Sequence, residues 1–452
     1  MPRKIGLCVL SAALLILAFP NYNLWILAWV GFVPLFFALR GESKKNAFLL
    51  AYLTGLIFWL GTIYWLIHVT LPGMLILALY LALYFGVFGL FIENRGLFFI
   101  SLVWVLLEYI RSHLFSGFPW LLLGYSQYLN LPAIQIADLT GAWGVSFLVM
   151  LVNVSIYRSR GGKIILPCLL LALSLGYGFY KINRIDTKLH TSAPVKISVI
   201  QGNIPQELKW DPAAKEHIID KYLTLTTDAL RDNPDLIIWP EAALPVVLEE
   251  EPGFFESVKE FCAEKNISLL LGAVTTRGGL YYNSALLISQ KGISRYDKLH
   301  LVPFGEYIPL RKVFRFLEAA VPIGDFAAGK EYTIFRNTNS FAVLICFEDL
   351  FPQISREFRL RGVDFLVNIT NDAWFKKTSS PYQHLSASVF RAVENRLPVI
   401  RAANTGVSGF IAPTGRIISL VKDKSGENIF IDAYKTENIF IPVSRPAGIS
   451  GG

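Results

Sequence analysis

The stretch Phe341-Ala-Val-Leu-Ile-Cys-Phe-Glu-Asp349 indicates the fold of the C-terminal half of the chain. Its first five residues are apolar and predict a buried β-strand, which ends at Cys346 with two carboxylates behind it. A cysteine at the turn from a strand into a helix is exposed, and nearby backbone amides can stabilise negative charge there. The stretch therefore predicts an α/β domain with a candidate nucleophile at a strand end.

Similar apolar runs recur on both sides of this stretch and alternate with helical patterns. We predict strands at Val195–Ile200, Leu236–Trp239, Ser268–Val274, Ala285–Ser289, Phe341–Ile345, Phe365–Ile369, Val399–Ala402 and Phe410–Ala412. We predict helices at about Pro212–Arg231, Phe254–Lys265 and His384–Asn395. Because alternating strands and helices build a layered core, residues 195–440 are expected to form one α/β domain.

Two other strand ends carry groups that suit the chemistry of a cysteine. Glu241 follows the strand that ends at Trp239, and Lys298 follows Tyr296 and Asp297. Side chains that leave the carboxyl ends of strands in an open α/β sheet commonly converge on one site. A glutamate can take the thiol proton and return it to a leaving group, and a lysine can stabilise a thiolate and an oxyanion. Glu241, Lys298 and Cys346 together therefore suffice for acyl transfer by way of a thioester.

Each of these residues also has an ordinary structural interpretation. A lone cysteine after an apolar strand is commonly a small buried hydrophobe. Glu241 can be the carboxylate that starts a helix, and Lys298 a solvated surface charge. The functional interpretation depends on the three residues occurring together.

The N-terminal part of the chain is apolar and poor in charge. The whole chain is 53% hydrophobic and 17% charged, with a mean hydropathy of +0.46, which excludes disorder and argues against an all-soluble protein. Seven apolar stretches approach the ~20 residues that a bilayer core requires. They are Ile5–Asn21, Leu24–Leu39, Phe48–Val69, Met74–Ile92, Gly96–Ile110, Ile136–Tyr157 and Ile164–Tyr180. We therefore predict a polytopic membrane domain at residues 1–181, followed by a polar linker at 182–194.

The positive charge of the chain indicates orientation rather than a nucleic-acid partner. The formal net charge is +8, and residues 1–180 hold 10 Lys/Arg against 4 Asp/Glu. All of these basic residues except Arg111 fall on alternate loops, on the side of the N-terminus: Arg3, Lys4, Arg40, Lys44, Lys45, Arg95, Arg158, Arg160 and Lys163. The positive-inside rule places the N-terminus in the cytoplasm and, after seven crossings, the α/β domain outside. The aromatic segment Gly117–Gln127 is expected to be a loop at the membrane interface, and Glu108 and Arg111 are expected to pair or to snorkel.

The order Trp239-Pro-Glu241, Asp297-Lys298 and Cys346-Phe-Glu348 resembles the carbon–nitrogen hydrolase (nitrilase) superfamily. Longer strings narrow the resemblance to the bacterial apolipoprotein N-acyltransferase family. They are Gln201-Gly-Asn-Ile-Pro205, Lys209-Trp-Asp-Pro212, Lys298-Leu-His-Leu-Val-Pro-Phe-Gly-Glu-Tyr-Ile-Pro309, Asn371-Asp-Ala-Trp-Phe375, Gly117-Phe-Pro-Trp120 and Gly124-Tyr-Ser-Gln127. The resemblance covers nearly the whole chain. It implies an α-β-β-α sandwich beside the helical membrane domain.

The resemblance also implies roles for the site residues. Cys346 would be the nucleophile that takes an acyl chain from a phospholipid, Glu241 the general base, and Lys298 the electrostatic partner of the tetrahedral intermediate. Glu306 and Glu348 would be supporting carboxylates, although a surface carboxylate and a structural ion pair are the alternatives. Trp210 and Trp374 would border the acyl-binding pocket, and simple packing is an equally good interpretation.

The resemblance implies two lipid-anchored substrates, a phospholipid donor and a lipoprotein acceptor with an N-terminal diacylglyceryl-cysteine. It places the protein in the bacterial inner membrane, with the catalytic domain in the periplasm. It implies no cofactor and no metal ion, and the 4 cysteines lack the close spacing of a zinc site.

One feature departs from the family pattern, and two other functions stay open. The family usually has a last transmembrane helix, whereas Asp432, Lys435 and Glu437 interrupt the final stretch, so residues 441–452 are expected to form an irregular tail. The first alternative function is a membrane-tethered amidase or nitrile hydrolase, in which water replaces the amine. The second is a transporter with an accessory domain, which would leave the Glu–Lys–Cys set unexplained.

Overall fold

The computed structural model describes residues 1–158, 165–189, 192–308 and 325–441. The chain divides into two compact units: Met1–Asn183 with Trp374–Glu394, and Arg184–Ala373 with Asn395–Gly452. The predicted basic loop residues Arg160 and Lys163 and nearly all of the predicted tail fall outside the described residues.

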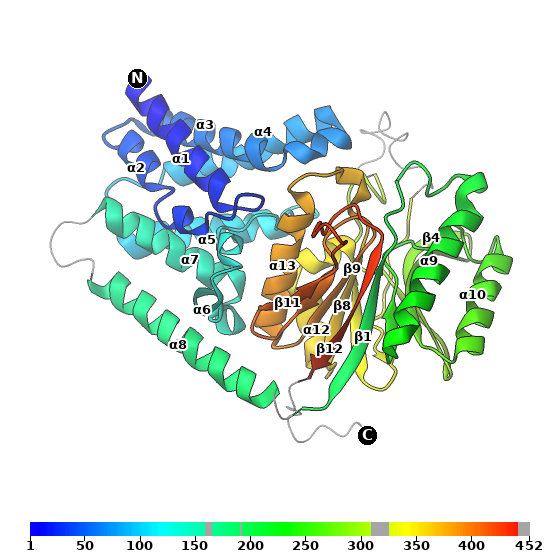
Figure 1. The fold of residues 1–452 in the computed structure, drawn as a ribbon. Helices are drawn as coiled ribbons and strands as arrows, with labels where there is room; N and C mark the ends of the chain where they lie inside the picture. The colour runs from blue at the N-terminus through cyan, green and yellow to red at the C-terminus, as the bar shows by residue number, and fades with distance from the viewer. Residues whose placement is uncertain (159–164, 190–191, 309–324, 442–452) are drawn as a thin grey trace. The chain divides into compact units, whose positions relative to one another are not determined.

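The first unit is helical (Figure 1). Each of the seven predicted apolar stretches contains helix, and three of the described helices, α4, α7 and α8, are long and apolar enough to cross a membrane. The second stretch is divided into η1 and α2, because Pro34 in the first turn of α2 lacks the N–H group that a continuous helix needs. The bounds are α1 Pro2–Ala18, η1 Trp25–Trp29, α2 Val33–Leu39, α3 Lys44–Thr62, η2 Tyr64–His68, α4 Leu71–Gly89, α5 Leu97–His113, η3 Leu123–Gln127, α6 Leu131–Ile134, α7 Ala137–Tyr157 and α8 Ile165–Leu189. The seven-span topology stays a prediction.

The last helix of this unit comes from the C-terminal half of the sequence. Helix α13, Ser380–Asn395, carries Gln383, whose side chain is 3% exposed. The Gln383 Oε1 atom accepts hydrogen bonds from the indole N–H groups of Trp65, at 3.0 Å, and Trp120, at 2.8 Å. Its Nε2 atom donates to the carbonyl oxygens of Thr62, at 3.0 Å, and Pro20, at 3.3 Å. One amide therefore joins α13 to three segments of the N-terminal region.

The structure adds detail to two predictions for the N-terminal region. Gly117–Gln127 was expected to be an interfacial loop, and its residues from Trp120 onward are buried. Of the two expectations for Glu108 and Arg111, the structure excludes snorkelling, because both residues are buried, and they interact electrostatically with each other. The Glu108 carboxylate accepts a hydrogen bond from the backbone N–H of Leu123 at 2.6 Å, and Arg111 donates to the carbonyl oxygens of Phe118 and Trp120. The segment is buried because these charged groups satisfy its backbone.

The second unit contains two six-stranded mixed sheets, in the orders β12-β1-β2-β3-β4-β5 and β11-β10-β9-β8-β7-β6. Strands β1, β2 and β3 are parallel in the first sheet, and β7, β8 and β9 in the second. The bounds are β1 Pro194–Gln201, β2 Leu236–Ile238, β3 Leu269–Arg277, β4 Leu280–Ser289, β5 Gly292–Asp297, β6 Phe335–Arg336, β7 Ser340–Ile345, β8 Phe365–Thr370, β9 Val399–Ala403, β10 Gly409–Ile411, β11 Ile417–Leu420 and β12 Ala433–Phe440. All eight predicted strands are present.

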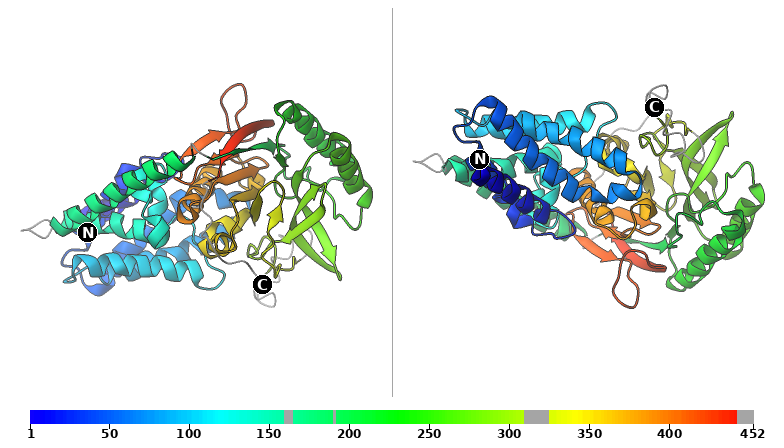
Figure 2. Two further views of the ribbon diagram at one scale, coloured as in Figure 1. Left: turned by 90° about the horizontal axis from the view of Figure 1, so that it is seen from below. Right: turned by 90° about the horizontal axis from the view of Figure 1, so that it is seen from above.

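Helices cover these sheets and complete the predicted α-β-β-α sandwich. The first sheet packs against α9, Lys215–Ala229, and α10, Pro252–Lys265 (Figure 2). Alternate residues of β3, Leu269, Leu271 and Ala273, join the core under these helices. The second sheet contacts α12, Pro352–Leu360. Short 3-10 turns flank these elements: η4 Pro212–Ala214, η5 Leu230–Asp232, η7 Cys346–Leu350 and η8 Asp372–Phe375.

The predicted linker is partly helical. Residues 182–189, expected to be irregular, form the end of α8, and β1 begins at Pro194. Composition alone did not show this, because the polar residues after Tyr180 lack the apolar character of the rest of α8 but still favour a helix.

Candidate active site

Cys346 lies where β7 ends and η7 begins, as predicted. Its φ angle is +52°, a left-handed conformation that non-glycine residues rarely adopt and that strained functional turns commonly contain. The Asn368 side chain of β8 stabilises this turn, because its Nδ2 atom donates to the carbonyl oxygens of Leu344, at 3.1 Å, and Cys346, at 3.3 Å. The sharp turn separates the Cys346 side chain from the line of the strand.

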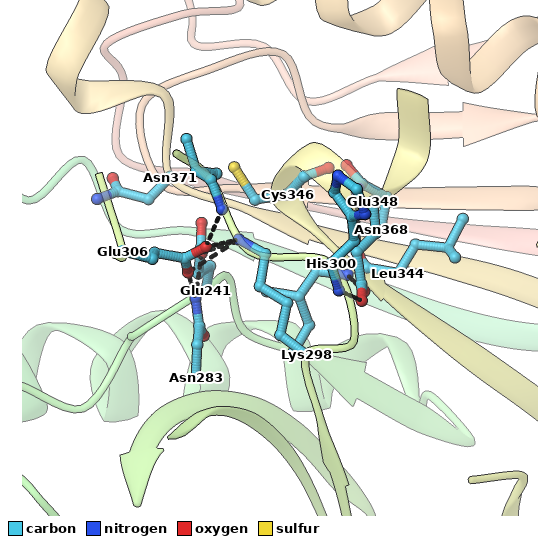
Figure 3. A network of polar contacts seen from close by, with 12 residues as sticks. Glu241, Asn283, Lys298, His300, Glu306, Leu344, Cys346, Glu348, Asn368 and Asn371 are labelled. Carbon is cyan, nitrogen blue, oxygen red and sulfur yellow. Dashed lines mark hydrogen bonds and ion pairs between the residues drawn. The ribbon is translucent and has the colours of Figure 1, made fainter. Parts of the chain in front are cut away.

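Glu241, Lys298 and Glu306 form one hydrogen-bonded group (Figure 3). The Lys298 Nζ atom lies 2.9 Å from the Glu306 carboxylate and 3.8 Å from Glu241 Oε1. Asn283 of β4, which the sequence analysis missed, donates from Nδ2 to Glu241 Oε1 and to Glu306 Oε1, at 2.7 Å each. Glu306 is thus a direct partner of Lys298 rather than a surface carboxylate. In Figure 3 the Cys346 sulfur lies on the side where these groups gather.

Burial and the charges of this group together determine the protonation states of Cys346 and Lys298. Burial raises the pKa of the Cys346 thiol well above its ordinary value, the carboxylate of Glu241 raises it further, and Lys298 opposes both. Burial lowers the pKa of Lys298, but the carboxylates of Glu306 and Glu241 outweigh it, so the pKa of Lys298 is raised. At neutral pH the sulfur is therefore a thiol and Lys298 an ammonium ion. A nucleophilic attack by Cys346 needs a base that takes its proton, and Glu241 is a carboxylate in the same group.

Glu348 connects the two chain segments that carry Lys298 and Cys346. One carboxylate oxygen accepts hydrogen bonds from the Tyr296 hydroxyl, at 2.8 Å, and from the backbone N–H of Leu299, at 2.6 Å. The other accepts from the backbone N–H of Ile345 at 2.7 Å. Burial raises the pKa of Glu348 to about 7, against the opposing effect of these hydrogen bonds. Glu348 therefore shapes the site through the backbone and not, among the described residues, as one half of an ion pair.

The two predicted tryptophans do not join this group. Trp210 is half-buried in the loop between β1 and η4, and Trp374 of η8 is 41% exposed and belongs to the helical unit. Within the described parts of the chain, neither indole has a hydrogen bond to Glu241, Lys298 or Cys346. Their role at an acyl-binding pocket stays a prediction.

Two site residues had only weak signals in the sequence. Asn283 is one of the few polar residues in the apolar β4, and a buried polar side chain of this kind requires hydrogen-bond partners. Lys209 belongs to one of the strings quoted above, and its Nζ atom donates to the carbonyl oxygen of Glu241 at 3.0 Å. Neither residue follows a predicted strand end, so the expectation that side chains at strand ends converge on one site does not identify them.

The chain is similar to known proteins in both of its halves. Residues 11–155 match the model of the apolipoprotein N-acyltransferase N-terminal domain, and residues 196–437 match that of carbon-nitrogen hydrolase. The chain is 41% identical to an apolipoprotein N-acyltransferase of Geobacter metallireducens, over 92% of this chain and 87% of that protein. It is 31% identical to one of Pasteurella multocida, over 91% of this chain and 86% of that protein. A solved amidase of Nesterenkonia sp. covers 55% of this chain at 18% identity, with a TM-score of 0.42.

The matches confirm the resemblance read from the sequence, in both halves of the chain. The two models together span the helical N-terminal region and the two-sheet unit, and the relatives align with more than nine-tenths of the chain. The chain belongs to the apolipoprotein N-acyltransferase family.

Proposed function

We propose that this enzyme transfers an acyl chain from a phospholipid, through a thioester on Cys346, to the N-terminal amine of a diacylglyceryl-cysteine lipoprotein. The observation that carries the mechanism is the single hydrogen-bonded group of Glu241, Lys298 and Glu306, placed with a protonated cysteine at a strand end. The names of the relatives support the acceptor. The apolar helices support a membrane location, which suits the two lipid-anchored substrates of this proposal.

In the first half-reaction the Glu241 carboxylate takes the thiol proton while the Cys346 sulfur attacks an ester carbonyl of the phospholipid. Lys298 stabilises the negative charge that develops on the carbonyl oxygen. The tetrahedral intermediate collapses as its C–O bond to the glycerol oxygen breaks, and Glu241 returns the proton to that oxygen. The products are the acyl thioester and a lysophospholipid.

In the second half-reaction the neutral amine of the lipoprotein attacks the thioester carbonyl. Glu241 takes a proton from the attacking nitrogen, the C–S bond breaks, and the proton passes to the sulfur. The products are an amide and the free Cys346 thiol. Glu306 holds Lys298, and Glu348 holds the backbone on both sides of the site, and the proposal gives both carboxylates a positioning role.

We further propose that the protein lies in the bacterial inner membrane, with its N-terminus in the cytoplasm and the two-sheet unit in the periplasm. The support is the excess of Lys and Arg in alternate loops of residues 1–180.

A labelled acyl chain on the phospholipid distinguishes transfer from hydrolysis. We expect purified enzyme, phospholipid and a diacylated lipopeptide to yield a triacylated lipopeptide that carries the label on its N-terminal nitrogen. The variant Cys346→Ala should yield none. Labelled free fatty acid as the only product would contradict the proposed transfer and favour the membrane-tethered hydrolase.

A further inference from the structure

Lys209 is a second buried lysine beside the general base. It lies in the loop between β1 and η4, its side chain is 3% exposed, and its Nζ atom donates to the carbonyl oxygen of Glu241 at 3.0 Å. The residues involved all belong to the two-sheet unit. The mechanism above does not use this ammonium ion.

The surroundings of Lys209 differ from those of Lys298. Lys298 lies 2.9 Å from a carboxylate, whereas in the described ranges no Asp or Glu oxygen comes within 4.0 Å of the Lys209 ammonium. A buried ammonium ion with a neutral backbone acceptor is costly unless other charges compensate for its lost hydration. The charges that act on Lys209 are those of Glu241 and, when it ionises, Cys346. Lys209 is therefore placed to respond to proton transfer between these two groups.

The backbone that Lys209 contacts is under strain. The carbonyl of Glu241 precedes Ala242, whose φ angle of +45° is unfavourable for a residue with a side chain. Gly272 of β3 allows the turn, because a Cβ atom there would lie 2.6 Å from the Glu241 Cα atom. The backbone N–H of Gly272 also donates to the Pro240 carbonyl at 3.1 Å. The position of the Glu241 carboxylate thus depends on this turn. The β3 backbone supports the turn through the N–H group of Gly272, and Lys209 supports it through the carbonyl oxygen of Glu241.

We propose that Lys209 is a positioning residue for acyl transfer: it holds the main chain of Glu241 and supplies a second positive charge to the group in which Cys346 loses its proton. The inference rests on the proposed function, since it assumes that Cys346 is acylated. In the first half-reaction the proton moves from sulfur to Glu241, so negative charge moves to the sulfur while both lysines remain positive.

Lys209 gives the reaction a pH dependence of its own. Burial lowers the pKa of Lys209 to about 8, and the charges of Glu241 and Cys346 oppose this effect. Lys298, in the same group with Glu306, has a raised pKa and keeps its charge at higher pH. The positive charge on Lys209 is present below about pH 8 and is lost above it, so the rate of thioester formation should stop rising, or fall, above this pH.

The test is the rate of thioester formation on Cys346 between pH 6 and pH 10, with full-length enzyme in phospholipid–detergent micelles. The variants are Lys209→Met and Lys209→Arg, with Lys215→Met, which removes the ion pair to Glu251, as the matched control. We expect Lys209→Met to form the thioester on the order of 10-fold to 100-fold more slowly and to lose the pH dependence near 8. Lys209→Arg should recover part of the rate and keep it to higher pH, because arginine stays charged. Lys215→Met should behave like the unmodified enzyme.

Two results would overturn the inference while the proposed function stands. One is a rate and pH profile of Lys209→Met that match those of the unmodified enzyme. The other is a slow rate in both Lys209 variants with an unshifted pH profile and a lowered melting temperature, which would indicate a purely structural role. If the unmodified enzyme forms no thioester on Cys346 while it transfers acyl chains, the proposed function itself fails.

Discussion

At the scale of single residues, Asn283 explains how two carboxylates and a lysine stay together in a buried site. Its one amide nitrogen has two N–H groups and donates one to Glu241 and the other to Glu306, at 2.7 Å each. Both carboxylates therefore lie close to the Lys298 ammonium ion, whose positive charge offsets part of the repulsion between them.

The sequence predicted the residues that follow strands and missed those that support them. Glu241, Lys298 and Cys346 were predictable because the ends of strands meet in an α/β domain. Asn283 lies inside β4, and Lys209 lies in a loop, so neither position was determined by a local pattern. Which side chain a buried amide or ammonium contacts depends on tertiary packing that no local pattern records.

The substitution Glu241→Gln tests the base. The glutamine carbonyl oxygen can still accept a hydrogen bond from Asn283, so the fold should be kept, but it cannot take the thiol proton. We expect the rate of thioester formation to fall on the order of 10²–10⁴-fold. Stopped reactions analysed by mass spectrometry give the rate, and Glu256→Gln on the exposed side of α10 is the control. A change of less than threefold would exclude Glu241 as the base.

The reactivity of the Cys346 thiol tests the electrostatics of the site. Because burial and Glu241 raise its pKa, iodoacetamide should alkylate Cys346 more slowly than glutathione at pH 8, and faster as the pH rises. Lys298→Met removes a charge that lowers this pKa, so it should slow alkylation, whereas Glu241→Gln removes a charge that raises the pKa and should speed it. Peptide mapping measures each rate. Variants that change the rate in the same direction would contradict the described charge balance.

At the scale of elements, the sequence did not predict strand β12, which is polar, and assigned helix α13 to the wrong unit. Strand β12 reads Ala-Tyr-Lys-Thr-Glu-Asn-Ile-Phe and pairs antiparallel with β1 at one end of its sheet, where solvent tolerates its charges. Helix α13 was predicted as a helix of the α/β domain, but it packs in the helical unit. Its amphipathic pattern indicates a buried face without indicating what buries it.

Gln383→Leu tests how far α13 depends on its hydrogen bonds. The substitution leaves two indole N–H groups and two backbone carbonyls without their partner, and each unsatisfied buried group costs about 1–3 kcal/mol. We expect the melting temperature of the detergent-purified protein to fall by several degrees. The control is Gln353→Leu, at an exposed position of α12. Equal melting temperatures for the two variants would show that Gln383 does not stabilise the helical unit.

At the scale of the whole molecule, the apolar helices and most of the excess positive charge lie in the N-terminal part of the chain. This distribution fits one orientation of the protein in a membrane. The +8 net charge lies mainly in the first 180 residues, at alternate loops on the predicted side of the N-terminus, and the two-sheet unit is close to neutral. The sequence therefore indicated an orientation. The sequence could not show which stretches cross the membrane, because the seven stretches differ in length and hydropathy. Three described helices have the length and hydropathy of a span, and the other stretches are shorter, interrupted or more polar.

Single-cysteine labelling tests the orientation. In a background in which Cys8, Cys168, Cys262 and Cys346 are all replaced by serine, a membrane-impermeant maleimide added to spheroplasts should label Ser257→Cys on α10. It should label Ser43→Cys, before α3, only after the membrane is opened. Ser43 lies in a predicted cytoplasmic loop and Ser257 in the predicted periplasmic unit, and both are exposed. Labelling of Ser43→Cys in intact spheroplasts would reverse the proposed topology.

In the proposed mechanism Cys346 carries the acyl chain. The direct measurement is the mass of the purified enzyme and of its Cys346 peptide after incubation with a phospholipid of defined acyl chains, in the absence of an acceptor. We predict a mass increase of one acyl group on Cys346, which hydroxylamine removes and Cys346→Ala abolishes. An enzyme that transfers acyl chains to a lipopeptide while Cys346 stays unmodified at every time point would contradict acyl transfer through a thioester on Cys346.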